Sequence, residues 1–319
     1  MQKFAYRASD LNLSMRVLIL GSAAGGGFPQ WNCNCDNCFR FRAGRFSGKS
    51  RTQTQVAVSA DGEQWALLNA SPDLRVQIES AKALHPKHPR RDSPIKDVVI
   101  TSADIDQIAG LLSLRELQPF QIHCMPSIGQ IIREGNSAFG MLNRIPEQVT
   151  WRDIELGNEI ELDASPSISC TAFSLGSRYP VYVPADIAAK LRPADALIGL
   201  MLKSSNGVTV AYLPAVPALD EPLMKQLAKT DLMLFDGTFW SNDELIRVQG
   251  SGASAREMGH IPISGAQGSL AQLAGLTRPR KVFLHVNNTN PILDETSAQY
   301  KEVRAAGWEV AEDGWEFEL

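Results

Sequence analysis

The chain has 319 residues, 44% of them hydrophobic, and a formal net charge of −4 at pH 7. Its length allows one large α/β domain or two small ones. The lack of a basic run argues against nucleic-acid binding. The apolar stretches are too short to span a bilayer, and residues 1–14 lack the pattern of a signal peptide. The five cysteines are clustered, which fits a reducing compartment better than a disulfide scaffold. We therefore expect a cytoplasmic protein with an N-terminal extension over 1–14 and a single domain over 15–319.

Short strands, turns and helical stretches alternate along the whole chain, which predicts one layered α/β domain with two sheets. Several strands are rich in Val, Leu and Ile, as strands covered on both faces are. The expected strands are 16–20, 55–59, 66–69, 98–101, 169–172, 208–212, 232–236 and 282–286. The expected helices are 72–83, 106–118, 219–230 and 264–275.

Three cysteines, Cys33, Cys35 and Cys38, lie within six residues after the first strand and a glycine-rich turn. Three thiolates at this spacing indicate a shared metal ion, and zinc is the usual guest of such ligands. The alternatives are a disulfide with a spare thiol, or three buried apolar cysteines. A disulfide between residues this close would be strained. A zinc site needs a fourth ligand, which the local sequence does not supply.

Two aspartates follow the buried strand that ends at about Thr101. Ser102 and Asp104 can project the same way from the end of the strand, and Asp106 lies where the next helix begins. One aspartate is explained by capping the helix. A second one at the carboxyl end of a buried strand favours a functional site.

Several blocks of sequence carry a family resemblance. Residues 98–112 resemble the region in which the metallo-β-lactamase superfamily has its H-x-H-x-D-H signature. The blocks at 21–35, 258–263 and 285–291 resemble the pyrroloquinoline quinone (PQQ) biosynthesis protein B family of that superfamily. The resemblance runs from about residue 15 to 295. It implies an α/β fold, the metallo-β-lactamase-like four-layer αββα sandwich, as a single domain.

The resemblance also implies an active site that differs from that of the superfamily's hydrolases. At the four signature positions this chain has Ser102, Asp104, Asp106 and Gln107, and only the Asp of the signature is kept. A two-zinc hydrolytic centre is therefore not expected. Asp104, Asp106 and His285 lie at metal-ligand positions, and two carboxylates with one imidazole suit a single divalent ion, expected to be Fe2+. The residues expected to support the metal or to contact the substrate or cofactor are Ser102, Asp73, Asp236, Gln107 and Asn290.

Related phosphodiesterases close a C-x-C-x-x-C zinc site with a late histidine. The matching position in this chain is His260. The resemblance thus implies a structural Zn2+ held by Cys33, Cys35, Cys38 and His260, closed to substrate because all four ligands come from the protein.

The function implied by the family is a step in PQQ synthesis. It would be an iron- and O2-dependent hydroxylation of the tyrosine ring in a crosslinked Glu–Tyr precursor, carried out by a non-haem iron oxygenase. Arg75, Arg115 and Arg178 are candidates for pairing with the precursor's carboxylates. Two other functions stay open: a carrier that transports PQQ or its precursor without turnover, and a metallohydrolase. The expected partners are the small molecule and O2, with no nucleic acid and no membrane span, and a homodimer is a further expectation.

Overall fold

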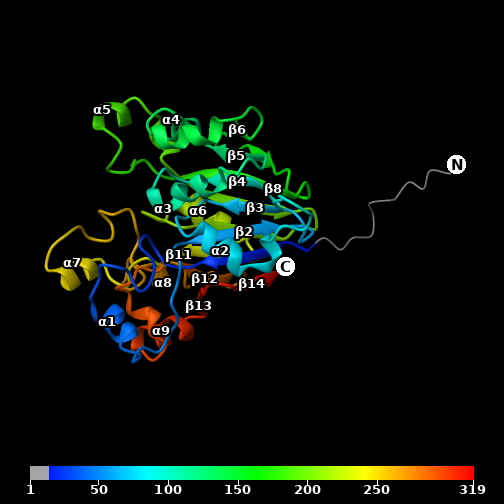
Figure 1. Ribbon diagram of the computed structural model, residues 1–319. Helices are drawn as coiled ribbons and strands as arrows, with labels where there is room; N and C mark the ends of the chain where they lie inside the picture. Colours follow the sequence, from blue (N-terminus) through cyan, green and yellow to red (C-terminus); the bar gives the residue numbers. More distant parts are fainter. Residues whose placement is uncertain (1–13) are drawn as a thin grey trace.

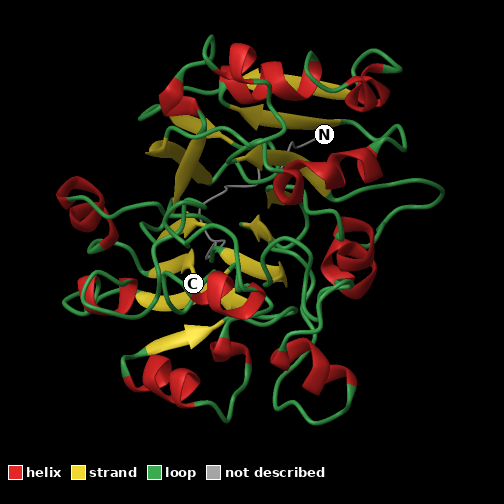
Figure 2. Cartoon of the chain, turned by 90° about the vertical axis from the view of Figure 1, so that its left-hand side faces the viewer, coloured by secondary structure: helices red, strands yellow, loops and turns green. Residues whose placement is uncertain are grey.

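The computed structural model describes residues 14–319 and contains two seven-stranded sheets. The extension expected over 1–14 lies outside the described residues except for Ser14. In the first sheet the strand order is β14-β1-β2-β3-β4-β5-β6, and in the second it is β13-β12-β11-β10-β9-β8-β7. Strands occupy the middle of the molecule and helices lie outside them (Figures 1 and 2). This is the predicted four-layer αββα sandwich.

The strands of the first sheet are β1 (Arg16–Gly21), β2 (Gln55–Ser59), β3 (Trp65–Leu68), β4 (Ile95–Ile100), β5 (Phe120–Cys124), β6 (Val149–Asp153) and β14 (Glu316–Glu318). Those of the second are β7 (Glu159–Glu161), β8 (Ile168–Gly176), β9 (Leu197–Ser204), β10 (Thr209–Leu213), β11 (Leu232–Asp236), β12 (Arg280–Leu284) and β13 (Trp308–Val310). The α-helices are α1 (Asp36–Arg42), α2 (Leu74–Ser80), α3 (Ile105–Ile108), α4 (Pro126–Arg133), α5 (Ala185–Ala188), α6 (Glu221–Leu227), α7 (Glu244–Gln249), α8 (Ser269–Gln272) and α9 (Ala298–Ala305). Within residues 14–319, none of these helices is both long and apolar enough to cross a membrane.

The central strands of the second sheet are buried on both faces. In β11, Leu232 and Leu234 belong to the core between the sheets, whereas Met233 and Phe235 belong to the core outside the second sheet. Alternate side chains of a strand point to opposite faces, so a continuous apolar run is what such a strand requires. In the outer core, the rings of Phe283 and Trp308 stack with centroids 4.0 Å apart.

The direction of the strands brings one end of each sheet to the same place. Strands β3 to β6 are parallel to one another, and so are β10 to β13. An isolated bridge joins Ser102, just after β4, to Leu197 at the start of β9. A second one joins Ala23, just after β1, to Val286 just after β12. The segments that follow β4, β11 and β12 therefore meet between the sheets, where polar side chains gather.

Candidate metal centres and active site

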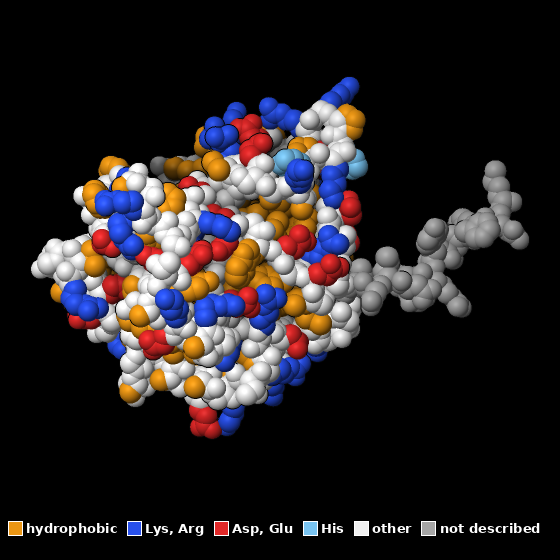
Figure 3. All heavy atoms as spheres, turned by 90° about the horizontal axis from the view of Figure 1, so that it is seen from below, with side chains coloured by type: hydrophobic (Ala, Val, Ile, Leu, Met, Phe, Trp, Pro, Cys, Tyr) orange, Lys and Arg blue, Asp and Glu red, His pale blue; other side chains and the backbone are white. Residues whose placement is uncertain are grey.

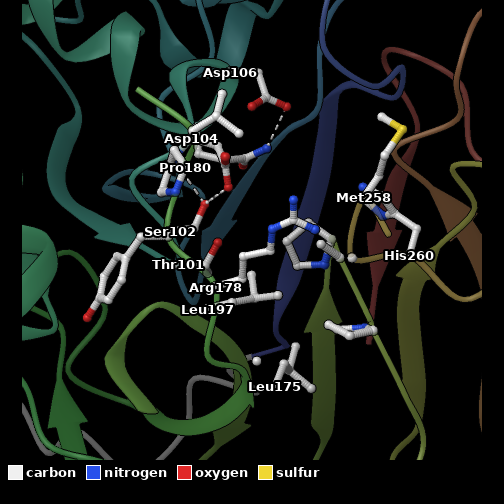
Figure 4. A pocket seen from close by; sticks show the side chains of 18 of the residues that line it. Thr101, Ser102, Asp104, Asp106, Leu175, Arg178, Pro180, Leu197, Met258 and His260 are labelled. Atoms are coloured by element: carbon white, nitrogen blue, oxygen red, sulfur yellow. Dashed lines mark hydrogen bonds between the residues drawn. The ribbon is translucent and has the colours of Figure 1, made fainter. Parts of the chain in front are cut away.

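A cavity of about 870 Å³ opens where the carboxyl ends of these strands meet. Its walls include Asp104 and Asp106 on one side and His260 and His285 on the other. Figure 4 shows the labelled aspartates and His260 on opposite sides of the pocket. The site therefore combines carboxylates from the first sheet with imidazoles from the second.

Both histidines are oriented by the hydroxyl of Thr238, two residues after the end of β11. Its Oγ1 lies 2.8 Å from His285 Nδ1 and 3.1 Å from His260 Nδ1. Asp236 lies behind this hydroxyl, accepting a hydrogen bond from it at 2.6 Å. The two imidazole rings are nearly parallel, with an interplanar angle of 21°. Since both Nδ1 atoms face Thr238, both Nε2 atoms face away from it.

Asp236 is fully buried, and each of its oxygens has two hydrogen-bond donors. Oδ1 accepts from the Thr238 N–H and hydroxyl, and Oδ2 lies 2.8 Å from the Val216 N–H and 2.9 Å from His260 Nδ1. Burial alone would raise the pKa of Asp236, but the charge of His260 and its hydrogen bond hold this pKa below the usual range. In the same pair, burial opposes protonation of His260, but Asp236 raises the pKa of the imidazole. Asp236, His260 and His285 are close enough to hold a metal, but the Thr238 hydroxyl contacts all three. We therefore assign Asp236 to orienting His260.

The other nitrogen of His285 meets Asp106. Nε2 of His285 lies 3.0 Å from Asp106 Oδ2, and the Gln107 amide donates to the same oxygen at 3.0 Å. Burial would raise the pKa of Asp106, but the hydrogen bond and charge of His285 lower it overall. His285 also has a positive φ of 59°. Residues other than glycine rarely have a positive φ, and backbone strain of this kind is concentrated at functional sites.

Gln107 is held in turn by Asn69, a buried residue with a positive φ of 69°. The Asn69 amide donates to Gln107 Oε1 and to the Tyr212 hydroxyl, and Asn69 Oδ1 accepts from the Thr101 N–H at 2.8 Å. The oxygen of Gln107 is thus occupied by a protein donor. This network holds the Gln107 amide in place, and Gln107 in turn positions Asp106.

Asp104 stands beside this group rather than within it. Its Oδ2 accepts a hydrogen bond from Ser102 Oγ at 2.7 Å. Burial and the neighbouring charge of Asp106 raise its pKa. The Tyr182 hydroxyl, which lines the cavity, donates to the Ala103 carbonyl, and burial and Asp104 raise the pKa of Tyr182 to about 12.

The spacing of His285 Nε2 and Asp106 Oδ2 fits two ligands of one metal ion. Two ligands at right angles with bonds of about 2.1 Å would lie about 3 Å apart, which is the separation of His285 Nε2 and Asp106 Oδ2. A metal-bound histidine commonly directs its other ring nitrogen to a carboxylate or hydroxyl, as His260 does towards Asp236 and His285 towards Thr238. The tautomers are inferred from these partners.

Three residues expected at the site, Asp73, Asn290 and the Asp236 described above, are absent from the walls of the cavity. Asp73 accepts hydrogen bonds from the main chain and side chain of Gln53. Asn290 is fully buried and donates to the carbonyls of Gly237 and Thr238. Asp73 and Asn290 therefore support segments around the site. Of the three candidate arginines, only Arg178 lines the cavity.

The three cysteines form a second cluster. The sulfur atoms of Cys33, Cys35 and Cys38 lie within 4.8 Å of one another. Tetrahedral zinc with bonds of about 2.3 Å would space its sulfur ligands about 3.8 Å apart. The Asn288 side-chain amide lies 3.4 Å from Cys38 Sγ and 3.6 Å from Cys35 Sγ. Asn37, in the cysteine segment, binds the Asn288 carbonyl at 3.1 Å.

His260 does not join this cluster, which corrects the predicted zinc site. Its Nδ1 is engaged by Asp236 and Thr238, and its main chain is held by Ala255. The group that reaches the cysteines is Asn288, three residues after His285 in the same segment. A single loop therefore carries both His285 and the residue that contacts the cysteines.

Glu244, the first residue of α7, holds this loop from the other side. Its Oε1 accepts from Thr289 Oγ1 at 2.5 Å and its Oε2 from the Trp240 N–H at 2.6 Å. Glu244 is buried, and burial raises the pKa of its carboxyl group to about 7. The segment that carries both His285 and Asn288 is thus tied to α7.

Sequence reasoning missed Thr238, Asn69 and Asn288. No local pattern distinguishes a threonine after a strand from any other. The positive φ of Asn69 and the contacts of Asn288 arise from segments far apart in the chain. The run Asn287–Asn290 was the one available signal, because four polar residues after a buried strand are unusual.

Comparisons with known proteins give a consistent result. A sequence model of the beta-lactamase superfamily domain matches residues 64–286. The proteins named coenzyme PQQ synthesis protein B from Azotobacter vinelandii and from Pseudomonas putida KT2440 are each 42% identical to this chain. Each match covers 96% of this chain and all of the relative.

Solved structures agree. The crystal structure of Zn2+-bound PqqB from Methylobacterium extorquens has a TM-score of 0.88 and 40% identity, over 95% of this chain and all of that one. A diphosphatase of the PhnP family has a TM-score of 0.65 at 17% identity, over 96% of this chain and 98% of that one, which shows the shared fold alone.

Proposed function

Because the chain belongs to the coenzyme PQQ synthesis protein B family, within the beta-lactamase superfamily, we propose that it is a metal-dependent oxygenase acting in PQQ synthesis. The observation that carries the proposal is the pair of histidines oriented through Nδ1, with His285 Nε2 against Asp106. Two imidazoles and one carboxylate are the ligand set of non-haem iron oxygenases.

In this proposal His260, His285 and Asp106 hold a single ferrous ion. The set retains Asp106 and His285 from the sequence prediction, adds His260, and leaves Asp104 as a neighbour. A second metal is disfavoured because the Gln107 oxygen is taken by Asn69 and the Ser102 hydroxyl is directed to Asp104. A two-metal hydrolase would need both positions as ligands.

A bound ferrous ion would activate O2 next to the substrate. Each hydroxylation of the tyrosine ring consumes one O2, together with two electrons and two protons from an external reductant such as ascorbate. One oxygen atom enters the ring and the other leaves as water. Asp104, at the wall of the cavity and bonded to Ser102, is placed to accept a hydrogen bond from a substrate hydroxyl or amine. The apolar residues Leu175, Leu197 and Pro180 would face the ring.

The cysteine cluster is proposed as the structural zinc site. The positions of the oxygen and nitrogen of a side-chain amide are assigned from their hydrogen-bond partners. Rotating the Asn288 amide by half a turn would exchange the two atoms, so that Oδ1 faces the ion as the fourth ligand. A zinc ion there would stabilise the segment that also bears His285, because binding energy at such a site adds to folding energy. Reduced thiols imply a reducing compartment such as the cytoplasm, and a homodimer stays part of the proposal.

The test is a reaction of the iron-loaded protein with a glutamate-crosslinked tyrosine substrate, O2 and ascorbate, followed by mass spectrometry. We expect oxygen to be added to the ring. The His260→Ala and Asp106→Asn variants should lose this activity, while the exposed variant Arg75→Gln keeps it. Unchanged substrate with stoichiometric PQQ binding would instead indicate a carrier. Cleavage of the substrate without added oxygen from O2 would indicate a hydrolase.

A further inference from the structure

Two arginines stand on one wall of the cavity. Arg178 follows β8 and Arg256 lies in the loop before His260, and both line the pocket. They are neighbours, because Arg178 Nη1 donates to the main-chain carbonyl of Glu257. In Figure 4, Arg178 extends between the labelled aspartates and His260.

Within the described part of the chain, neither guanidinium is hydrogen-bonded to a carboxylate, although Glu257 lies close to Arg178 and lines the same cavity. Arg256 donates to the Gln267 carbonyl at 2.8 Å, and Arg178 to the Glu257 carbonyl, so both bond to main-chain oxygens and neither makes an ion pair. A guanidinium has five N–H donors, so most of them remain for a ligand. The nearby Glu257 carboxylate is held instead by Ser254, at 2.7 Å from its N–H and 2.8 Å from its hydroxyl.

Some other exposed arginines of this protein are paired with carboxylates. Arg278 and Arg280 make hydrogen-bonded ion pairs with Asp231 and Glu309 at 3.0 Å and 2.6 Å. On the face seen in Figure 3, basic and acidic side chains are interspersed. Arg178 and Arg256 are two adjacent cations that line one cavity and are hydrogen-bonded only to main-chain oxygens.

Charge and polarity divide the cavity into zones. Asp104 and Asp106 line one side, and the wall with Arg178 and Arg256 also includes Glu257, so two positive charges there face one negative charge. Apolar side chains, among them Leu175, Leu197 and Met258, also line the space. A flat ring fits the apolar zone, and its anionic groups are repelled by the aspartates and attracted by the arginines.

We propose that Arg178 and Arg256 form a carboxylate-binding subsite, so that the ligand is an aromatic compound with at least two carboxylates, bound with its ring towards His260 and Asp106. Arginine binds carboxylates with two parallel hydrogen bonds, which fixes orientation as well as adding affinity. The subsite deepens the proposed function because it sets which part of the substrate faces the metal ligands. It would discriminate against esters and amides of the same ring.

The test is a binding titration of PQQ, a ring compound with three carboxylates, to the full-length metal-loaded protein without O2. The variants are Arg178→Gln, Arg256→Gln and Arg178→Lys, and the matched controls are Arg75→Gln and Arg115→Gln, which lie outside the cavity. We expect each Gln variant in the cavity to raise the Kd about tenfold or more, from loss of hydrogen bonds to a charged group. Arg178→Lys should weaken binding less, and both controls should match the wild-type protein.

The trimethyl ester of PQQ separates charge recognition from ring binding. Its Kd should exceed that of PQQ for the wild-type protein and should be the same for all variants. Wild-type affinity in both Gln variants, equal affinity for ester and acid, or no binding of PQQ to the wild-type protein would overturn the subsite. Because no turnover occurs without O2, a failure of hydroxylation would leave this result standing. Hydroxylation with unchanged binding in the variants would refute the subsite alone.

Discussion

Replacing Glu244 by Gln should change how the stability of the protein depends on pH. Burial raises the pKa of this carboxyl from about 4.5 to about 7 in the folded state. Between these values the folded state binds more protons than the unfolded state, so the free energy of unfolding falls as pH rises. At about 1.4 kcal/mol per pH unit, the full penalty is about 3 kcal/mol, and most of it develops between about pH 5 and about pH 8.

Glu244→Gln removes this penalty and can keep both contacts, since Oε1 can accept from the Trp240 N–H while Nε2 donates to Thr289 Oγ1. Urea unfolding at the two pH values gives the difference in unfolding free energy between the variant and the wild-type protein. We expect this difference to shift by about 2–3 kcal/mol in favour of the variant at the higher pH. The exposed substitution Glu134→Gln is the control. Equal pH dependence of Glu244→Gln and wild-type stability would refute the assignment of a buried, protonated carboxyl.

Three further changes test the two metal centres and their support. Cys38→Ser should remove one zinc per chain, measured by elemental analysis, and lower the melting temperature, whereas zinc retained at the wild-type level would contradict the cysteine site. Asp236→Asn should weaken ferrous binding about 10- to 100-fold in an anaerobic titration, because the Asn side chain no longer orients His260 as a carboxylate does. An unchanged affinity would count against this role of Asp236. Asn69→Ala should lower the free energy of unfolding, measured by urea denaturation, by about 2–4 kcal/mol, because it leaves Gln107 and other buried groups without partners. A loss below about 1 kcal/mol would show that the network is dispensable.

Much of the fold could be predicted from local sequence. Strands β2 and β11 match their predicted bounds because continuous Val, Leu, Met and Phe runs are required where both faces are covered. Six strands were not predicted: β5, β6, β7, β9, β13 and β14. Strand β9 contains Gly199, where a side chain would collide with the ring of Phe173. Packing there depends on a neighbouring strand, which local sequence does not reveal.

Helix lengths were overestimated for the same reason. The segment expected as one helix over 106–118 is α3 followed by a 3₁₀ stretch, Ala109–Leu114. Gly110 lies against the carbonyl of Ser71, and its N–H donates to the Ala70 carbonyl, so a long-range contact shapes this turn. Tertiary contacts override helix propensity in such segments.

For the site, the sequence indicated which residues are chemically able to act but not how they are grouped. Asp106 and His285, which were predicted to share a site, have side chains 3.0 Å apart, and their role as metal ligands stays a prediction. His260 was assigned to the cysteines because a resemblance transfers positions and not contacts. Its actual partner is Asp236, the last residue of β11, which also accepts a hydrogen bond from Thr238. These three residues come together only through the packing of the second sheet.

The central claim is that His260, His285 and Asp106 form an oxygenase centre, and the origin of the added oxygen tests it most directly. The iron-loaded protein would react with the crosslinked Glu–Tyr substrate under isotopically labelled O2 in unlabelled water, with mass spectrometry of the product. The account predicts labelled oxygen on the ring, and none with the His260→Ala variant. Oxygen drawn from water, or a product formed equally well without O2, would contradict an oxygenase and favour hydrolytic chemistry on this fold.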